Sequence, residues 1–179
     1  MIRKFQNHTP QIPDSCYIFP TATIIGDVVL GENVIAYPGV VIRGERHKVV
    51  IGDNTNLQEN STIHMEWDRD CIIGSGVTIG HNAIIHACTI CDNVLVGMGA
   101  IVQDGAVIGE NSFIGAVALI PRKMIVPPGS MVYGFPARIV RPITQAEYEE
   151  IRESAAEYQL YKQDLEAQDA ALAKEGFLD

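Results

Sequence analysis

Three histidines, His64, His81 and His86, carry the side chains in this sequence best suited to holding a divalent metal ion. Imidazole nitrogens bind zinc at roughly 2.0–2.1 Å, and three of them leave one position of a tetrahedral ion open for water. An open position is expected of a catalytic site, because the ion lowers the pKa of bound water and yields hydroxide near neutral pH. The chain must therefore contain elements that bring three such rings together.

A six-residue apolar period organises most of the chain and predicts those elements. The first register is Ile18, Ile24, Leu30, Ala36 and Ile42. After a slip of three residues the period resumes as Ile51, Leu57 and Ile63, after a slip of four as Ile73, Ile79 and Ile85, and after a five-residue step from Ile90 to Val132. No α-helix has this period, whereas a short strand followed by a tight corner does.

Three such sixes close a triangular coil of about 18 residues, whose inward side chains stack roughly 4.8 Å apart on successive rungs. Glycine often follows the aliphatic residue, as in Leu30-Gly31 and Ile73-Gly74. It suits corners that need an unusual φ/ψ or a close backbone approach. The sequence therefore predicts an all-β parallel β-helix, a hexapeptide-repeat prism, over residues 1–143.

The spacing of the histidines places two of them on one edge of this prism. His64 and His86 are 22 residues apart, and removing the four-residue slip leaves 18, one full coil. Each also follows an isoleucine directly, so both rings are expected on neighbouring rungs. His81 lies 13 residues past His64 after the same correction and falls on a different face. It can complete the site only from another molecule, and a threefold homotrimer offers that geometry.

The chain changes character near residue 143. Thr144 with Glu147 makes a capping box, and an apolar stripe at three-four spacing follows. The stripe is Tyr148, Ile151, Ala155, Tyr158, Leu165 and Leu172. We expect an α-helix within residues 144–179, ending near Gly176 and packing on the prism or on a neighbouring subunit.

Composition and charge exclude several classes of function. The 13 Lys+Arg against 22 Asp+Glu give a net charge of −9, which argues against nucleic acid or a membrane as partner. No apolar run approaches the roughly 20 residues of a bilayer span, and the N-terminus lacks a signal-peptide core. We expect a cytoplasmic protein whose four cysteines are small packed residues.

Several segments of the sequence resemble the γ-class carbonic anhydrases and their bacterial relatives. They are Arg43-Gly44-Glu45, Thr55-Asn56-Leu57-Gln58, Ile63-His64, Gly80-His81-Asn82-Ala83-Ile84-Ile85-His86 and Val96-Gly97-Met98-Gly99-Ala100. The resemblance covers roughly residues 10–140 and the C-terminal helix. It implies that the coil is left-handed, a hand that general crossover rules do not favour.

The resemblance also implies roles for individual residues. His64 and His86 of one subunit and His81 of the next would bind zinc, with iron or cobalt possible, and the metal-bound hydroxide would hydrate carbon dioxide to bicarbonate. Gln58 and Asn56 would position the bound water and carbon dioxide, and a neutral amide can indeed donate to or accept from hydroxide. Arg43 would pair with an acid across the trimer interface, where Glu45 is the nearest candidate. Tyr158 resembles a tyrosine directed toward the metal cavity.

This chain departs from the family pattern at two positions. Glu45 stands where an aspartate is usual, and Arg46 stands where the best-studied active type carries a glutamate. Fast hydration of carbon dioxide needs an acidic proton shuttle. We assign that role to Glu66, the acid closest in sequence to His64, with Asp68 and Asp70 as alternatives.

Two other functions compete with this carbonic anhydrase-like lyase. One is acyl transfer or thioester hydrolysis by an acyl-CoA transferase or thioesterase-type enzyme, because hexapeptide prisms also host CoA-dependent transferases and some relatives sit in acid-catabolic pathways. Such an enzyme needs one general-base histidine and cations for the CoA phosphates, for which Arg122, Lys123, Arg138 and Arg141 are available. Three convergent histidines are superfluous to it. A non-catalytic trimeric scaffold would keep the prism and the helix without needing a metal.

Overall fold

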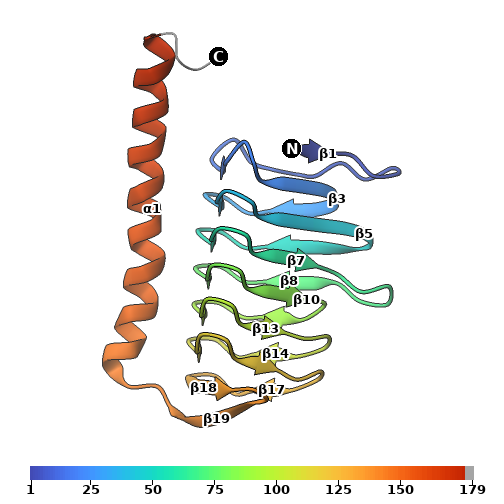
Figure 1. Cartoon of the computed structure of the whole chain (residues 1–179), viewed down its shortest axis with the longest axis vertical. Coiled ribbons are helices and arrows are strands. Elements are labelled where there is room, and N and C mark those ends of the chain that lie inside the picture. Colours follow the sequence, from blue (N-terminus) through green and yellow to red (C-terminus); the bar gives the residue numbers. More distant parts are fainter. Residues whose placement is uncertain (176–179) are drawn as a thin grey trace.

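The computed structural model describes residues 1–175 and shows a parallel β-solenoid followed by one long helix (Figure 1). The predicted parallel β-helix is therefore confirmed. The early strands are β1 Ile2–Arg3, β2 Tyr17–Ile18, β3 Thr23–Leu30, β4 Ile35–Ala36, β5 Val41–Ile51, β6 Asn56–Leu57, β7 Thr62–His64, β8 Cys71–Ile73 and β9 Thr78–Ile79. The later elements are β10 Ile84–His86, β11 Thr89–Ile90, β12 Leu95–Val96, β13 Ile101–Val102, β14 Val107–Ile108, β15 Phe113–Ile114, β16 Leu119–Ile120, β17 Ile125–Val126, β18 Ser130–Gly134, β19 Ala137–Pro142 and α1 Gln145–Lys174.

Two hydrogen-bonded sheets build the solenoid, one of 11 strands and one of eight. Parallel pairing stacks the repeat positions directly, so that Ile42, Ile63 and Ile85 lie beside one another on successive rungs. All three are fully buried. Burial of each such aliphatic side chain stabilises the fold by roughly 1.5–3 kcal/mol. The strands therefore pair in the register that buries the aliphatic residue of every six-residue repeat. Cys71 and Cys88 belong to the same core, as expected of small packed residues.

The interruptions of the period are local excursions from the coil. The three-residue slip is a bulge in β5, where residues 45–48 lie opposite the single residue Asp27 of β3. The four-residue slip is a short hairpin closed by the Glu66–Arg69 bridge. The five-residue step contains Ala87, whose φ is +45°. In Figure 1 the N-terminal hairpin and the loop before β8 extend from the side of the prism away from α1.

The corners of the coil require positive φ at some positions and close backbone approach at others. Positive φ is carried by asparagines, among them Asn33 at +58° and Asn82 at +58°, and by a second set of glycines such as Gly76 at +64°. The glycine after an aliphatic repeat residue instead permits close approach of neighbouring rungs. A Cβ on Gly97 would stand only 2.5 Å from the backbone nitrogen of Ala116. Glycine is thus required there by space and not by φ.

The helix α1 follows the prism along its side (Figure 1). The predicted capping box is confirmed, since Thr144 accepts from the Glu147 backbone and Glu147 accepts from the Thr144 backbone. Ile151, on the predicted apolar stripe, is fully buried, and Lys162 joins the same stripe and pairs with Glu166 at 2.8 Å. The Tyr17 hydroxyl donates to Asp169 at 2.5 Å and ties the far end of α1 to the prism. Gly176, the expected helix end, lies outside the described residues.

Within residues 1–175 no helix has the length and apolar character needed to cross a bilayer.

Replacing Glu147 with glutamine is expected to lower the melting temperature at pH 7. The Arg141 guanidinium, at 2.6 and 2.7 Å, and the Thr144 backbone lower the pKa of Glu147 from 4.5 to about 2. A lowered folded-state pKa contributes stability above the unfolded value, and this is lost as pH falls from about 4.5 towards 2. Thermal melts across this window should therefore show the difference between the two proteins shrink with acid.

The exposed Glu149, in the same helical turn, provides the matched control as Glu149→Gln. If the melting temperatures of the parent and Glu147→Gln differ by the same amount down to pH 2, the loss of stability comes from packing and not from the ionised carboxylate.

Candidate metal centre

His64 and His86 lie beside each other on one edge of the solenoid. They end strands β7 and β10, whose parallel register pairs His64 with His86 directly. Nδ1 of His64 lies 3.1 Å from Nε2 of His86, and the ring centroids are 5.1 Å apart. Two nitrogens that bind one tetrahedral ion at 2.0–2.1 Å stand roughly 3.3 Å apart. The observed separation therefore suits two ligands of a single cation.

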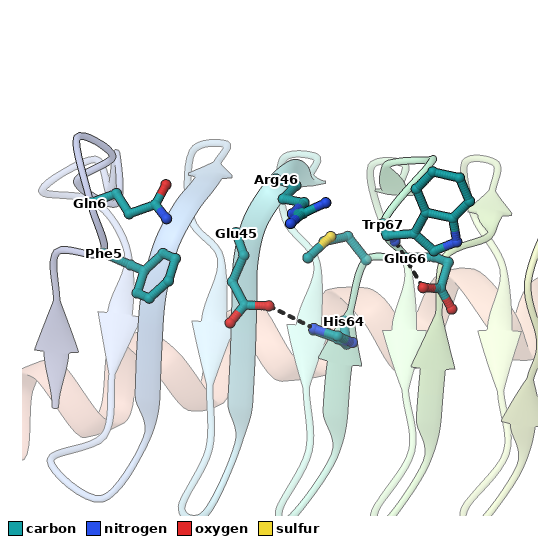
Figure 2. A pocket seen from close by; sticks show the side chains of 8 residues that line it. Phe5, Gln6, Glu45, Arg46, His64, Glu66 and Trp67 are labelled. Atoms are coloured by element: carbon teal, nitrogen blue, oxygen red, sulfur yellow. Dashed lines mark hydrogen bonds and ion pairs between the residues drawn. The ribbon is translucent and has the colours of Figure 1, made fainter.

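The surroundings of His64 keep its ring in the neutral form that a metal requires. Burial, followed by the charge of Arg43 and the proximity of His86, lowers the pKa of His64 below its ordinary value of 6.5. Its Nε2 is buried and has no hydrogen-bond partner among the described residues; Glu45 Oε2 stands 3.6 Å away. Figure 2 shows His64 below Glu45 at the base of an open cavity. A neutral imidazole can bind a metal, and here Nδ1 is the nitrogen beside His86, whereas Nε2 lies on the Glu45 side of the ring.

His86 is oriented by a carboxylate that sequence reasoning missed. Asp104 Oδ1 lies 2.5 Å from Nδ1 of His86, and Asp104 Oδ2 lies 2.8 Å from Arg122. The Asp104 side chain is only 12% exposed. A carboxylate on Nδ1 fixes the tautomer and directs Nε2 outward, as is usual for metal-bound histidines. A signal was present, because Asp104 follows His86 by 18 residues, and Arg122 follows Asp104 by the same interval.

Arg43 and Glu45 pair within one chain in this structure. Both lie on β5, and Arg43 Nη1 donates to Glu45 Oε1 at 2.6 Å. Register places Arg43 directly beside His64. The expected pairing of Arg43 with an acid of a neighbouring subunit stays a prediction, and Glu45 is bound here by Arg43 of the same chain.

His81 lies on a different edge, after β9 of the eight-stranded sheet. Its Nδ1 is 2.6 Å from Glu59 Oε2, a second carboxylate that the sequence analysis missed, and its side chain is 42% exposed. Glu59 precedes His81 by 22 residues, the spacing of His64 and His86. As at His86, this arrangement directs Nε2 away from the chain.

Asn56 and Gln58 belong to the edge that carries His81. Gln58 Oε1 accepts from the His81 backbone N–H at 3.2 Å, and Gln58 Nε2 donates to Asn56 Oδ1 at 3.5 Å. Asn56 in turn donates to Thr78 Oγ1 at 2.9 Å. Both amides are buried, so their orientations are set by this chain of hydrogen bonds. One N–H of Gln58 remains available to an external oxygen.

Tyr158 joins the same edge from α1. It lines a groove of about 470 Å³ between the helix and the prism, together with Gln58 and His81. Its ring packs edge-on against Tyr37 at 5.6 Å, and burial raises the pKa of its hydroxyl.

Glu66, the expected proton shuttle, lies on the His64 edge. One of its oxygens accepts from the Trp67 backbone N–H at 2.9 Å. Ligand atoms of Glu66, His86 and Asp104 lie within 4.8 Å of one another. A carboxylate this close to His86 and open to the surface loop is well placed to exchange protons with solvent.

One chain thus carries two different half-sites. One edge holds His64, His86, Glu66 and Asp104, and the other holds His81, Gln58, Asn56 and Tyr158. Two features fit a divalent cation: the 3.1 Å separation of His64 Nδ1 and His86 Nε2, and the carboxylates behind His81 and His86. A single site with all three histidines, which stays a prediction, would combine the two edges from different molecules.

Comparisons with known proteins agree with the fold and indicate a class of enzyme. Residues 87–122 match the family model described as bacterial transferase hexapeptide (six repeats). The chain is 40% identical over 158 residues to a carbonic anhydrase of Geobacillus kaustophilus, covering 88% of this chain and 87% of that protein. It is 36% identical to gamma carbonic anhydrase 1 of Arabidopsis thaliana, a mitochondrial protein; the match covers 83% of this chain but only 56% of the length of that relative.

Other relatives carry different names. The carnitine operon protein CaiE of Escherichia coli K12 is 34% identical over 155 residues, covering 87% of this chain and 79% of CaiE. A solved hexapeptide transferase family protein from Anaplasma phagocytophilum superposes with a TM-score of 0.88 at 37% identity, covering 91% of this chain and 96% of that structure.

Proposed function

The chain belongs to the γ-class carbonic anhydrase-like family of hexapeptide-repeat proteins, and from this premise we propose that it reversibly hydrates carbon dioxide at a metal ion shared between subunits of a homotrimer. The observation that carries the proposal is the 3.1 Å separation of the His64 and His86 ring nitrogens, with Asp104 behind His86. The family membership supplies the reaction class.

His64 and His86 of one subunit and His81 of the next would hold the ion, with zinc expected and iron or cobalt as alternatives. When bound, such an ion supplies a hydroxide nucleophile near neutral pH by lowering the pKa of water. Asp104 and Glu59 would accept from Nδ1 of His86 and His81 and so leave Nε2 of each ring free to hold the ion. The lowered pKa of His64 keeps the third ring neutral.

The amide groups of the His81 edge would orient the substrate. Gln58 is fixed by His81 and Asn56, so its remaining N–H points in a set direction and can donate to an oxygen of carbon dioxide or bicarbonate. Preorganised donors cost no reorganisation when negative charge develops on that oxygen.

Proton removal would fall to Glu66. It lies on the loop between β7 and β8, near His86, and its carboxylate can accept a proton and release it to bulk water. Arg43 donates a hydrogen bond to Glu45 beside His64.

Stopped-flow assays on zinc-loaded and iron-loaded protein test this function, with metal analysis and native mass measurement on the same samples. We expect a trimer, one ion per chain and hydration above the buffer rate for at least one metal. A trimer that binds one ion per chain yet gives no rate above buffer with either metal would refute the hydration of carbon dioxide.

Acyl transfer from CoA is the second candidate, favoured by the transferase names of the family model and of the Anaplasma structure. Its cationic requirement is less well met here. Of the four cations considered for CoA phosphates, Arg122 is paired with Asp104 and Arg141 with Glu147. CoA binding by the metal-free protein, with no hydration activity in the loaded protein, would favour this alternative.

A further inference from the structure

A cavity of about 340 Å³ opens beside His64 and is bounded by the irregular segments of the chain. Its walls come from the N-terminal hairpin, through Phe5 and Gln6; from the β5 bulge; and from the loop after β7 (Figure 2). A second cavity of about 480 Å³ adjoins it and shares Phe5, Gln6 and Glu45. Sites for small organic molecules typically measure about 300–1,000 Å³. The space is thus far larger than a triatomic substrate needs.

The charges around this space are predominantly positive. The two cavities are lined by four cations and two acids: Arg3, Lys4, Arg43, Arg46, Glu45 and Glu66. Glu45 is compensated by Arg43 at 2.6 Å. Within residues 1–175 no carboxylate forms an ion pair with Arg46, in a chain whose net charge is −9. A basic recess in an acidic protein attracts anions.

Arg46 is the cation best placed to bind such an anion. Figure 2 shows its guanidinium between Glu45 and Trp67, above His64. A guanidinium stays protonated and binds carboxylates through parallel N–H donors. Glu66, the remaining acid, accepts from the Trp67 backbone N–H and forms the far wall.

Two aromatic side chains leave apolar surface in the same recess. Trp67 is 68% exposed and Phe5 is 36% exposed, although large apolar side chains gain free energy when they are covered. Both line the cavity, and Figure 2 shows them at its opposite ends, with Arg46 between them. This combination suits a ligand with one anionic end and an apolar body.

We propose that this cavity binds a small organic acid, its carboxylate on Arg46 and its short acyl chain between Phe5 and Trp67. The inference goes beyond the proposed function, because it names a second ligand that binds beside His64 whether or not carbon dioxide is hydrated there. Gln6 would donate a further hydrogen bond to the carboxylate. The ion at the histidines is not required for this binding.

The single tryptophan of the chain, Trp67, reports directly on occupancy. Titration of the metal-loaded trimer with hexanoate, at constant ionic strength, is expected to give a saturable change in tryptophan fluorescence. Hexanamide, which keeps the chain and lacks the charge, should bind at least tenfold more weakly. Inorganic phosphate, which has the charge without the chain, should also bind more weakly than hexanoate.

Arg46→Gln is expected to weaken hexanoate binding at least tenfold and to leave hexanamide binding unchanged. Arg46→Lys should recover part of the affinity, and the exposed Arg138→Gln provides a matched control that should bind like the parent. Calorimetry with Trp67→Phe checks that binding persists without the reporter. A metal-free arm should bind hexanoate with similar affinity.

Several results would overturn the inference. Equal affinity for hexanoate and hexanamide would show that the carboxylate makes no favourable contact with Arg46. Equal affinity for hexanoate and phosphate would show that the acyl chain makes no favourable contact with the aromatic side chains. Binding lost on metal removal but retained in Arg46→Gln would place the carboxylate on the ion. No binding to the trimer at all would mean that a neighbouring subunit fills the cavity. Stopped-flow hydration rates decide the proposed function separately from each of these outcomes.

Discussion

Mixing two inactive variants, His81→Ala and His86→Ala, is expected to restore metal binding and carbon dioxide hydration to about one quarter of the parental level, since each site of a cyclic trimer draws on two neighbouring chains. A His81→Ala chain still supplies His64 and His86, and a His86→Ala chain still supplies His81. Random assembly pairs them correctly at about one interface in four. Each variant alone should bind less than a tenth of an ion per chain and lose roughly a thousandfold in rate.

Recovery must come from mixed trimers to be informative. Differently tagged chains, unfolded together and refolded, would be purified on both tags and weighed by native mass spectrometry. In these purified mixed trimers the expected recovery rises from about one quarter to about one third, because each has one correctly paired interface in three. His47→Ala serves as the matched control, because His47 pairs with Asp70 on the loop side and takes no part in either half-site. Mixed trimers that contain both variants and recover no metal would exclude a site shared between subunits.

Replacing Asp104 with alanine is expected to weaken metal affinity by about 10–100-fold, the usual effect of removing a carboxylate behind a metal-bound histidine. The side chain holds Nδ1 of His86 at 2.5 Å and is itself fixed by Arg122 at 2.8 Å. Without it, the His86 ring can rotate and adopt the other tautomer, which presents a proton to the ion. Asp104→Asn should lose less, because the amide oxygen can still accept from Nδ1.

Competition with a chelator measures this affinity directly, and the visible spectrum of the cobalt-loaded protein reports the coordination geometry. Asp92→Asn is the matched control, because the Asp92 side chain accepts from the Ser75 backbone at a corner of the prism. An Asp104→Ala protein with parental affinity and an unchanged cobalt spectrum would show that Asp104 does not orient His86.

Much of the architecture followed from the six-residue period alone. Each inward position stacks on its equivalent one rung away, so a repeated local pattern specifies the strands, the stacked core and the 18-residue coil. The same arithmetic predicted that His64 and His86 share an edge and that His81 does not. Positions one and two coils of 18 residues after His86 are Asp104 and Arg122, and neither was predicted from the sequence to belong to the site.

The site itself depends on features that have no period. The slips in the repeat were visible in the sequence, but their shapes were not, because residues 45–48 could bulge towards any neighbour. The tertiary structure brings this bulge, the hairpin at Phe5 and the loop at Trp67 to one cavity, although they lie far apart along the chain.

The sequence by itself determined the prism, its register and the edge on which each histidine lies, because apolar burial rewards one repeated spacing on every rung. Only the tertiary structure decided which carboxylate lies behind His81 and His86, that Arg43 pairs with Glu45 within one chain, and that Arg46 and Trp67 line one cavity. Those contacts join side chains from separate excursions of the backbone. Their geometry depends on the three-dimensional path of each excursion, which no single repeat unit encodes.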